Sequence, residues 1–204
     1  MVEYISDQEH TQLRHAERRA PSILHLSGAG LTIGTQILTE FGDVPVEGLK
    51  PGDMVIGESH QAQKLNYIAF QDVDLLTCPE LAPICISDPK CPDNASTYFA
   101  PCQALVLRHP MFRSLFGNPE VEVECRHLAD LPGAKVERDL RSITYVALGF
   151  SQNQSIYCNG ILAHSRPQAS AGPRPSLGQE ESALAWRLVN LQLGQAKRHG
   201  FPLQ

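Results

Sequence analysis

The stretch from residue 30 to residue 56, GLTIGTQILTEFGDVPVEGLKPGDMVI, constrains the fold more than any other part of the chain. It alternates turns with short runs of β-branched and apolar residues, and these runs are 32–38, 44–46 and 54–56. Phe41-Gly42-Asp43 and Pro51-Gly52-Asp53 form the turns, because glycine tolerates a positive φ and proline fixes φ at a value that turns need. Runs this short, separated by turns this definite, predict a meander of small antiparallel strands.

Similar short runs recur through the rest of the central region. They are 65–70, 84–87, 98–107, 121–125, 142–148 and 154–162. In the run at 121–125, Val121, Val123 and Cys125 alternate with glutamates, which is the pattern of a strand with one buried face. The chain is expected to contain about nine to eleven short strands and no central helix, so the sequence predicts a mainly β fold.

The composition narrows the class of protein. The chain has 204 residues, of which 42% are hydrophobic and 19% charged, and a chain of this size can bury a sizeable core. Its net charge of -5 argues against nucleic acid as the main partner, since that usually needs a basic face. No apolar run reaches the ~18 residues of a membrane span. The N-terminus, MVEYISDQEH, is acidic where a signal peptide is basic, so we expect a cytoplasmic protein, with leaderless export left open.

Residues 1–29 are interpreted as an N-terminal helical extension and linker. Ser6 and Glu9 have the spacing of a capping box, which marks the start of a helix. Arg14 and Arg18 belong to the most basic patch of the chain. Such charges usually form a solvated helix face, and the alternative is that this face docks on an acidic protein partner.

The C-terminal part predicts a linker and a second helix. Residues 167–177 are rich in Pro, Ala, Ser and Gly and are interpreted as a flexible linker, and residues 178–204 as an amphipathic helix. At 100° per residue the helix has two apolar stripes, one of Leu177, Leu184, Leu188 and Leu191, the other of Trp186, Val189 and Leu193. A helix packed on its own domain needs only one stripe. The second stripe is therefore predicted to contact another chain, and the alternative is a helix buried on both sides.

Four blocks follow one another between residues 30 and 166. The first is the opening stretch, and the later blocks are YFAPCQALVL, LFGNPEVEVECRHLAD and ITYVALGFSQNQSIYCNGILAHS. In this order and spacing they resemble the blocks of Hint domains, the fold shared by inteins and the hedgehog autoprocessing domain, in particular a bacterial branch called Hint_2. The resemblance implies a compact Hint-like β domain over residues 30–166, with the two helical extensions on either side.

The resemblance also implies where catalytic residues would stand. Hint autoprocessing begins when a thiol or hydroxyl at the first position of the domain attacks the preceding carbonyl, while a histidine protonates the scissile amide. Gly30 occupies the first position and Gln103 that of the histidine, and neither side chain can do this chemistry. Two later histidines of the family fall on Ala147 and Asn153, and the final Glu-Ser becomes His164-Ser165.

The cysteines offer a different site. Cys78, Cys85, Cys91 and Cys102 lie in one proline-rich segment, but none of their spacings is C-x-x-C, so ordinary thiols are favoured over a metal site, with metal binding and disulfides left open. Cys102 is adjacent to Gln103, and a partner histidine such as His109 or His127 would make it a nucleophile. Nothing in the spacing brings such a pair together.

These replacements predict a domain that keeps the fold and has lost the activity. We expect a catalytically inactive Hint-like domain without a cofactor, which serves as a structural or protein-interaction subunit of a larger bacterial assembly. The competing hypothesis is an autoprocessing or cysteine-dependent enzyme of the Hint family.

Overall fold

The structure, a computed structural model, describes residues 29–87, 96–152, 154–165 and 174–199, with side chains as far as residue 190 of the last helix. Within these ranges the strands are β1 Leu31–Thr32, β2 Gln36–Thr39, β3 Gly42–Pro45, β4 Met54–Ile56, β5 Ala62–Lys64, β6 Tyr67–Asp74, β7 Ile84–Ser87, β8 Ser96–Phe99, β9 Ala104–Arg108, β10 Glu120–Glu124, β11 Ala134–Val136, β12 Ser142–Gly149, β13 Ser155–Cys158 and β14 Ile161–His164. The helices are α2 Phe112–Phe116 and α3 Gln179–His199, with short 3-10 helices η2 Val46–Gly48, η3 Pro79–Leu81 and η4 Cys125–Leu128. Arg14 and Arg18 of the predicted N-terminal helix lie outside the described residues.

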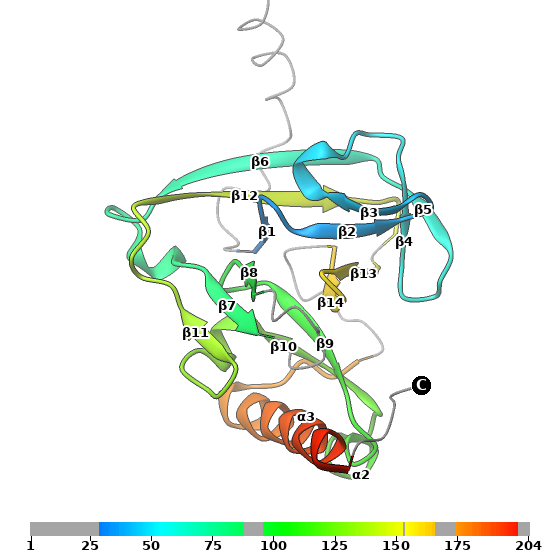
Figure 1. Cartoon of the computed structure of the whole chain (residues 1–204), viewed down its shortest axis with the longest axis vertical. Helices are drawn as coiled ribbons and strands as arrows, with labels where there is room; N and C mark the ends of the chain where they lie inside the picture. The colour runs from blue at the N-terminus through cyan, green and yellow to red at the C-terminus, as the bar shows by residue number, and fades with distance from the viewer. Residues whose placement is uncertain (1–28, 88–95, 153, 166–173, 200–204) are drawn as a thin grey trace, which may run out of the picture.

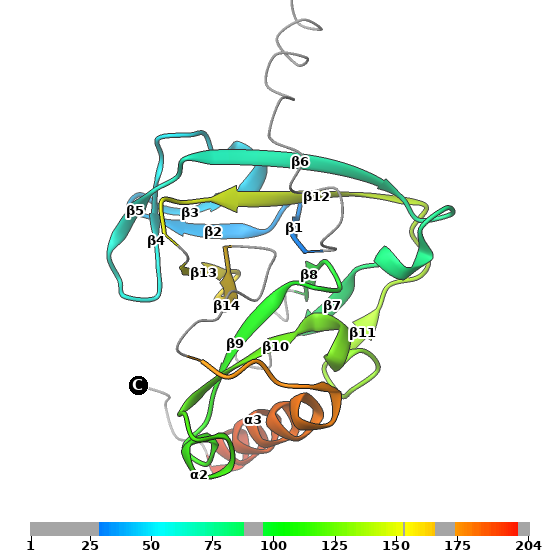
Figure 2. The same ribbon diagram turned by 180° about the vertical axis from the view of Figure 1, so that it is seen from behind.

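Two antiparallel sheets make up the molecule (Figure 1, Figure 2). The first has six strands in the order β11-β7-β8-β1-β12-β6. The second has eight, with β10-β9-β14-β13-β2-β4-β5 in order and β3 paired to β2. Neighbouring strands in each sheet run antiparallel, as the turn-punctuated sequence predicts. The mainly β fold of short strands is therefore confirmed.

The longest ribbon of the first sheet is made by β6 and β12. Their register runs from Ser142 opposite Asp74 to Gly149 opposite Tyr67. At that last pair the Tyr67 ring covers Gly149 so closely that a Cβ on Gly149 would lie 1.8 Å from a ring carbon. Only glycine fits under this ring. The ribbon crosses the top of the molecule in Figure 1 and carries β12 past β1.

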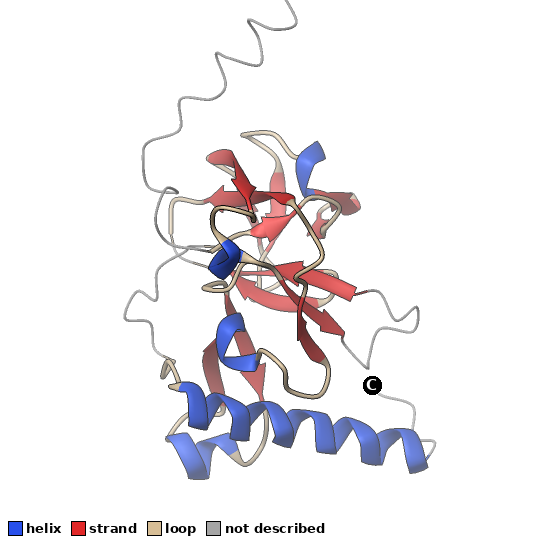
Figure 3. Ribbon diagram, turned by 90° about the vertical axis from the view of Figure 1, so that its left-hand side faces the viewer, coloured by secondary structure: helices blue, strands red, loops and turns tan. Residues whose placement is uncertain are grey.

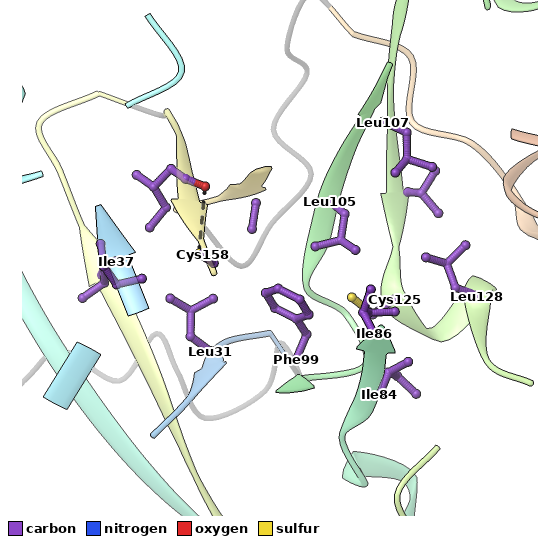
Figure 4. Close-up of a cluster of buried hydrophobic side chains, with 14 of the residues drawn as sticks. Leu31, Ile37, Ile84, Ile86, Phe99, Leu105, Leu107, Cys125, Leu128 and Cys158 are labelled. Atoms are coloured by element: carbon purple, nitrogen blue, oxygen red, sulfur yellow. Dashed lines mark hydrogen bonds between the residues drawn. The ribbon is translucent and has the colours of Figure 1, made fainter. Parts of the chain in front are cut away.

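The main hydrophobic core takes side chains from both sheets. Leu31 and Phe99 of the first sheet and Ile37 and Leu105 of the second belong to it, and Figure 4 shows them directed into a shared interior. Ile37, Phe99 and Leu105 are fully buried. Burying a side chain of this size stabilises the fold by about 1.5–3 kcal/mol, so this core holds the two sheets together.

α3 packs along one end of the β domain (Figure 3). Ala185 is 0% and Trp186 5% exposed, and both belong to the main core. The indole N–H of Trp186 donates to the carbonyl of Pro132 at 2.8 Å, which satisfies the one polar atom of this buried ring. α3 is therefore a part of the folded domain. Among the described residues, no helix has both the length and the apolar character to cross a membrane.

Residues of both apolar stripes of α3 pack on the β domain. Leu177 of one stripe and Trp186 of the other belong to the main core, Leu188 and Val189 pack against it, and Leu184 is 45% exposed. The prediction that Trp186 contacts another chain is wrong, because helical periodicity locates apolar stripes without saying which residues meet the core. For Val189, which is partly buried, a contact with another chain stays a prediction. The side chain of Leu193 lies outside the described part of the chain.

Several local expectations also differ from the structure. The run at 98–107 divides into β8 and β9, which belong to different sheets. The segment before Gly117 forms the short helix α2, closed by Gly117 in the left-handed conformation, where no helix was expected. Short helices of this kind leave little periodic signal in the sequence.

The predicted linker at 167–177 is structured at its end. Residues 174–177, which we call the strap, lie beside the outer edge of β10 (Figure 2). The amide of Glu122 donates to the carbonyl of Pro175 at 3.0 Å, and the amide of Leu177 donates to the carbonyl of Glu122 at 3.0 Å. A composition rich in Pro and Ser does not reveal such backbone pairing, because the partner is more than fifty residues away.

Candidate functional site

The positions that the resemblance assigns to catalysis meet in one small hollow. Its lining residues, which define the Gly30 hollow, are Ala29, Gly30, Leu31, Gln103, Val146, Ala147, Leu148, Ile156, His164 and Ser165. Its free volume is about 10 Å³, close to what one water molecule needs. The structure thus brings Gly30, Gln103 and Ala147 together, as expected, whereas Asn153 lies outside the described residues.

Gly30 is held at the start of β1, between two neighbouring strands. Its carbonyl accepts a hydrogen bond from the amide of Ala100 at 2.9 Å, and the next residue, Leu31, pairs with Val146 of β12 and Phe99 of β8. These contacts hold the carbonyl of Gly30 and the strand that follows it in place. Residue 30 itself brings no side chain to the hollow.

The surroundings of Gly30 also oppose a larger residue. Its φ is +151°, a conformation that residues with a side chain rarely adopt, and an added Cβ would lie 3.1 Å from the Cβ of Tyr145. Tyr145 is 3% exposed, and its hydroxyl donates to the carbonyl of Leu81 at 2.6 Å. Burial raises the pKa of Tyr145, so its hydroxyl stays protonated. Tyr145 was not singled out from the sequence, where it is one apolar residue in an ordinary strand.

Gln103 is committed to structural hydrogen bonds. The side chain is buried, and its Nε2 donates to the carbonyl of His164 at 2.8 Å and to that of Ala104 at 3.1 Å. An amide nitrogen has two hydrogens to donate, and both are used here. Gln103 therefore fastens the loop before β9 to the end of β14.

His164 and Ser165 close the hollow from the C-terminal side of the β domain. The Nε2 of His164 lies 2.5 Å from Oε1 of Glu122, and the Glu122 side chain is only 4% exposed. His164 is the partner that the buried carboxylate of Glu122 needs, since burying a charge without a partner is costly. Ser165 forms two hydrogen bonds with the backbone of Gln154, through its amide at 2.8 Å and its hydroxyl at 3.4 Å.

The cysteine alternative gains no support from the pKa of Cys102 or from the contacts of His109. Burial raises the pKa of Cys102, and the nearby Arg126 offsets this only in part, so the thiol is not activated. His109 packs on the ring of Phe112 and its Nδ1 accepts the amide of Met111. The described cysteines are free thiols, and no group of metal-ligating side chains occurs in the described ranges. Cys91 lies outside these ranges.

A second set of functional groups lies at the edge of β10, and sequence reasoning missed it. Arg108 and Arg174 both bind Glu120, through Nε at 2.6 and 2.7 Å, and both also contact Glu58. Burial alone would raise the pKa of Glu120, but the hydrogen bonds from Arg174 and Arg108 lower it below its usual value. In the sequence, this set of groups was marked only by the EVEVE run of β10 and by Arg174 between two prolines.

Residues 29–169 match the Hint domain, which is more than half of the chain. The chain belongs to the Hint domain family. This confirms the family inferred from the four sequence blocks. Whether the domain has lost the activity stays a prediction.

Solved structures similar to this Hint domain include inteins and an intein-like domain. The gp41-1 intein shares 14% identity at a TM-score of 0.42, covering 67% of this chain and 98% of its own. The MchDnaB-1 intein shares 10% at 0.42, covering 67% and 99%. A bacterial intein-like domain from Clostridium thermocellum shares 13% at 0.43, covering 66% and 97%. The comparison with curated proteins found no match.

Proposed function

We propose that this Hint domain is catalytically inactive and serves as a structural or protein-interaction subunit of a larger bacterial assembly. The observation that carries the proposal is Gly30, which lacks a nucleophile and at which an added Cβ would lie 3.1 Å from the Cβ of Tyr145. An acyl shift at the Ala29–Gly30 peptide requires a thiol or hydroxyl within reach of that carbonyl.

The acid of the reaction is missing as well. The buried amide of Gln103 cannot transfer a proton near neutral pH, and its two N–H groups already bind the carbonyls of Ala104 and His164. Ala147 adds a methyl group to the hollow and nothing else. Loss of both the nucleophile and the acid leaves the scaffold without a reaction path.

A role in interactions fits the surface that remains. The outer face of α3 exposes Leu184, flanked by the exposed and charged Glu181 and Arg187. We expect a protein partner to use this face, in place of Trp186, which the domain itself buries. The roles of Arg14 and Arg18 in partner binding and the cytoplasmic location stay predictions.

Intact-mass measurement of the purified chain tests the loss of activity. We expect one full-length mass before and after incubation with a thiol such as dithiothreitol, which would cleave any thioester formed at residue 30. A fragment starting at Gly30 would contradict the proposal, and a fragment produced only with thiol would identify an autoprocessing enzyme.

Co-purification tests the interaction role separately. The tagged wild-type chain and a Leu184→Glu variant would be isolated from the native cells and their bound proteins compared, with the exposed Arg138→Ala, which lies outside α3, as the matched control. We expect at least one partner to be lost only with Leu184→Glu. Identical sets of partners in all three samples would contradict a role for this face.

A further inference from the structure

The C-terminal segment, residues 174–190, binds the rest of the domain in the way that a peptide ligand binds a receptor. The strap adds to the edge of β10 by a parallel bridge between Glu122 and Ser176, with two backbone hydrogen bonds at Glu122. Addition of an extended peptide to a free sheet edge is a common mode of peptide recognition, in which the backbone supplies affinity. β10 is the last strand of the eight-stranded sheet, so its outer edge is free for such an addition.

Side chains give this contact its specificity. Arg174, whose side chain is 14% exposed, reaches both Glu58, in the turn between β4 and β5, and Glu120, at the start of β10. Leu177, three residues later, is 5% exposed. Arg174 thus occupies an acidic site on the rest of the domain, and Leu177, three residues later, occupies an apolar site.

A third anchor, after Arg174 and Leu177, lies two turns into α3. Trp186 packs into the main core, and its indole N–H reaches the carbonyl of Pro132. Buried tryptophan and arginine are the residues that most often dominate the affinity of protein interfaces. The segment therefore carries three anchors, Arg174, Leu177 and Trp186, on three separate sites of the receptor.

We propose that the surface that holds residues 174–190 is a docking site, and that the same segment of a second copy of this chain can occupy it. Residues 166–173 (RPQASAGP) join the segment to the end of the β domain, so only eight residues separate Ser165 from Arg174. The contacts are identical whether the segment comes from the same or another copy, and the short connection favours the same copy through a high effective concentration. Cutting the connection removes this advantage.

The experiment cuts the folded full-length chain in the connection. A site for a sequence-specific protease replaces residues 166–173, and after cleavage a fluorescent synthetic peptide of residues 174–204 is added in excess. We expect the cut fragment to co-elute with the β domain in size-exclusion chromatography and the labelled peptide to replace it in a saturable manner. Fluorescence anisotropy then measures the Kd of the labelled peptide.

Variants placed in the peptide alone avoid any effect on the folding of the domain. Trp186→Ala is expected to weaken binding by about thirtyfold or more and Arg174→Ala by about tenfold, while the exposed Arg187→Ala serves as the control and stays within about twofold. Equal Kd values for all four peptides would overturn the proposal. So would a cut fragment that never exchanges, or a domain that loses its native circular dichroism once the chain is cut.

This inference does not depend on the inactivity of the Gly30 hollow. Exchange of the C-terminal peptide and cleavage of the Ala29–Gly30 bond are separate measurements on different parts of the chain. Either proposal can therefore fail while the other stands.

Discussion

The Gly30 hollow and the edge of β10 are neighbouring regions that differ in the charge of their side chains. His164 belongs to both, because it lines the hollow and its ring contacts Glu122 on β10. The other residues that line the hollow are uncharged. The edge of β10 is rich in charged groups, and these bind the C-terminal segment. The comparison teaches that one domain can place an uncharged hollow directly beside a charged edge that binds a distant segment.

The largest effect should come from the anchor of α3. Trp186→Ala removes a buried ring and its hydrogen bond to Pro132, and we expect the free energy of unfolding to fall by about 3–5 kcal/mol. Urea denaturation followed by circular dichroism measures this. The exposed Arg187→Ala should change stability by about 0.5 kcal/mol or less. A Trp186→Ala variant as stable as this control would show that α3 is dispensable to the fold.

The next effect tests the hollow. Gly30→Cys should destabilise the fold by about 1–3 kcal/mol, because a side chain is strained at this φ and crowds Tyr145. We also expect no self-cleavage, even when Gln103→His is added. Thermal unfolding and intact mass measure the two outcomes. Gly48→Ala is a suitable control for stability, since its Cβ would meet Val44 at an ordinary 3.6 Å. Efficient self-cleavage by the Gly30→Cys, Gln103→His double variant would contradict the expectation and show that two substitutions suffice to restore activity.

A smaller loss is expected at the edge of β10. Arg174→Ala leaves Glu58 and Glu120 with Arg108 as their shared cation, and should cost about 1–2 kcal/mol. Arg138→Ala is the matched control, because its ion pair to Asp130 is long and exposed and should contribute about 0–1 kcal/mol. Both are measured by urea denaturation. Equal losses in the two variants would argue that the buried network is no stronger than a surface pair.

The smallest effect is a dependence of stability on pH. The pKa of Glu120 is lower in the folded chain than its usual value of 4.5, so its contribution to stability is present above that value and disappears as the pH falls through the lowered folded pKa. Glu120→Gln should therefore reduce the loss of stability between neutral and acidic pH. Urea denaturation at a series of pH values measures this slope, and an unchanged slope would contradict the role of Glu120.

Much of the β domain could be anticipated from local pattern. The turns at Gly42 and Gly52 and the alternation in the run at 121–125 are encoded by neighbouring residues, and β10 formed where this alternation indicated. The run at 32–38, expected as one strand, instead divides into β1 and β2, which belong to different sheets. The identity of the residues in the hollow followed from the order of the four blocks, since Gly30, Gln103 and Ala147 do meet. Local signals suffice when the interactions that decide an element lie within a few residues of it.

Residues controlled by distant contacts could not be found in this way. Glu122 looked like an exposed position of an alternating strand, but the strap and His164 bury it. Arg174 looked like part of a linker until β10 and Glu58 supplied its partners. Each case depends on segments far apart in the sequence, whose approach no local pattern encodes.

The sequence by itself determined the family, the class of fold and the absence of a nucleophile at residue 30, because these depend on the identity of the residue at each position of the chain. The tertiary structure decided which residues of α3 are buried and that Tyr145 crowds Gly30. It also decided that residues 174–177 are bound to β10. These depend on burial and on hydrogen bonds between distant segments, and such contacts exist only once the two sheets have packed together.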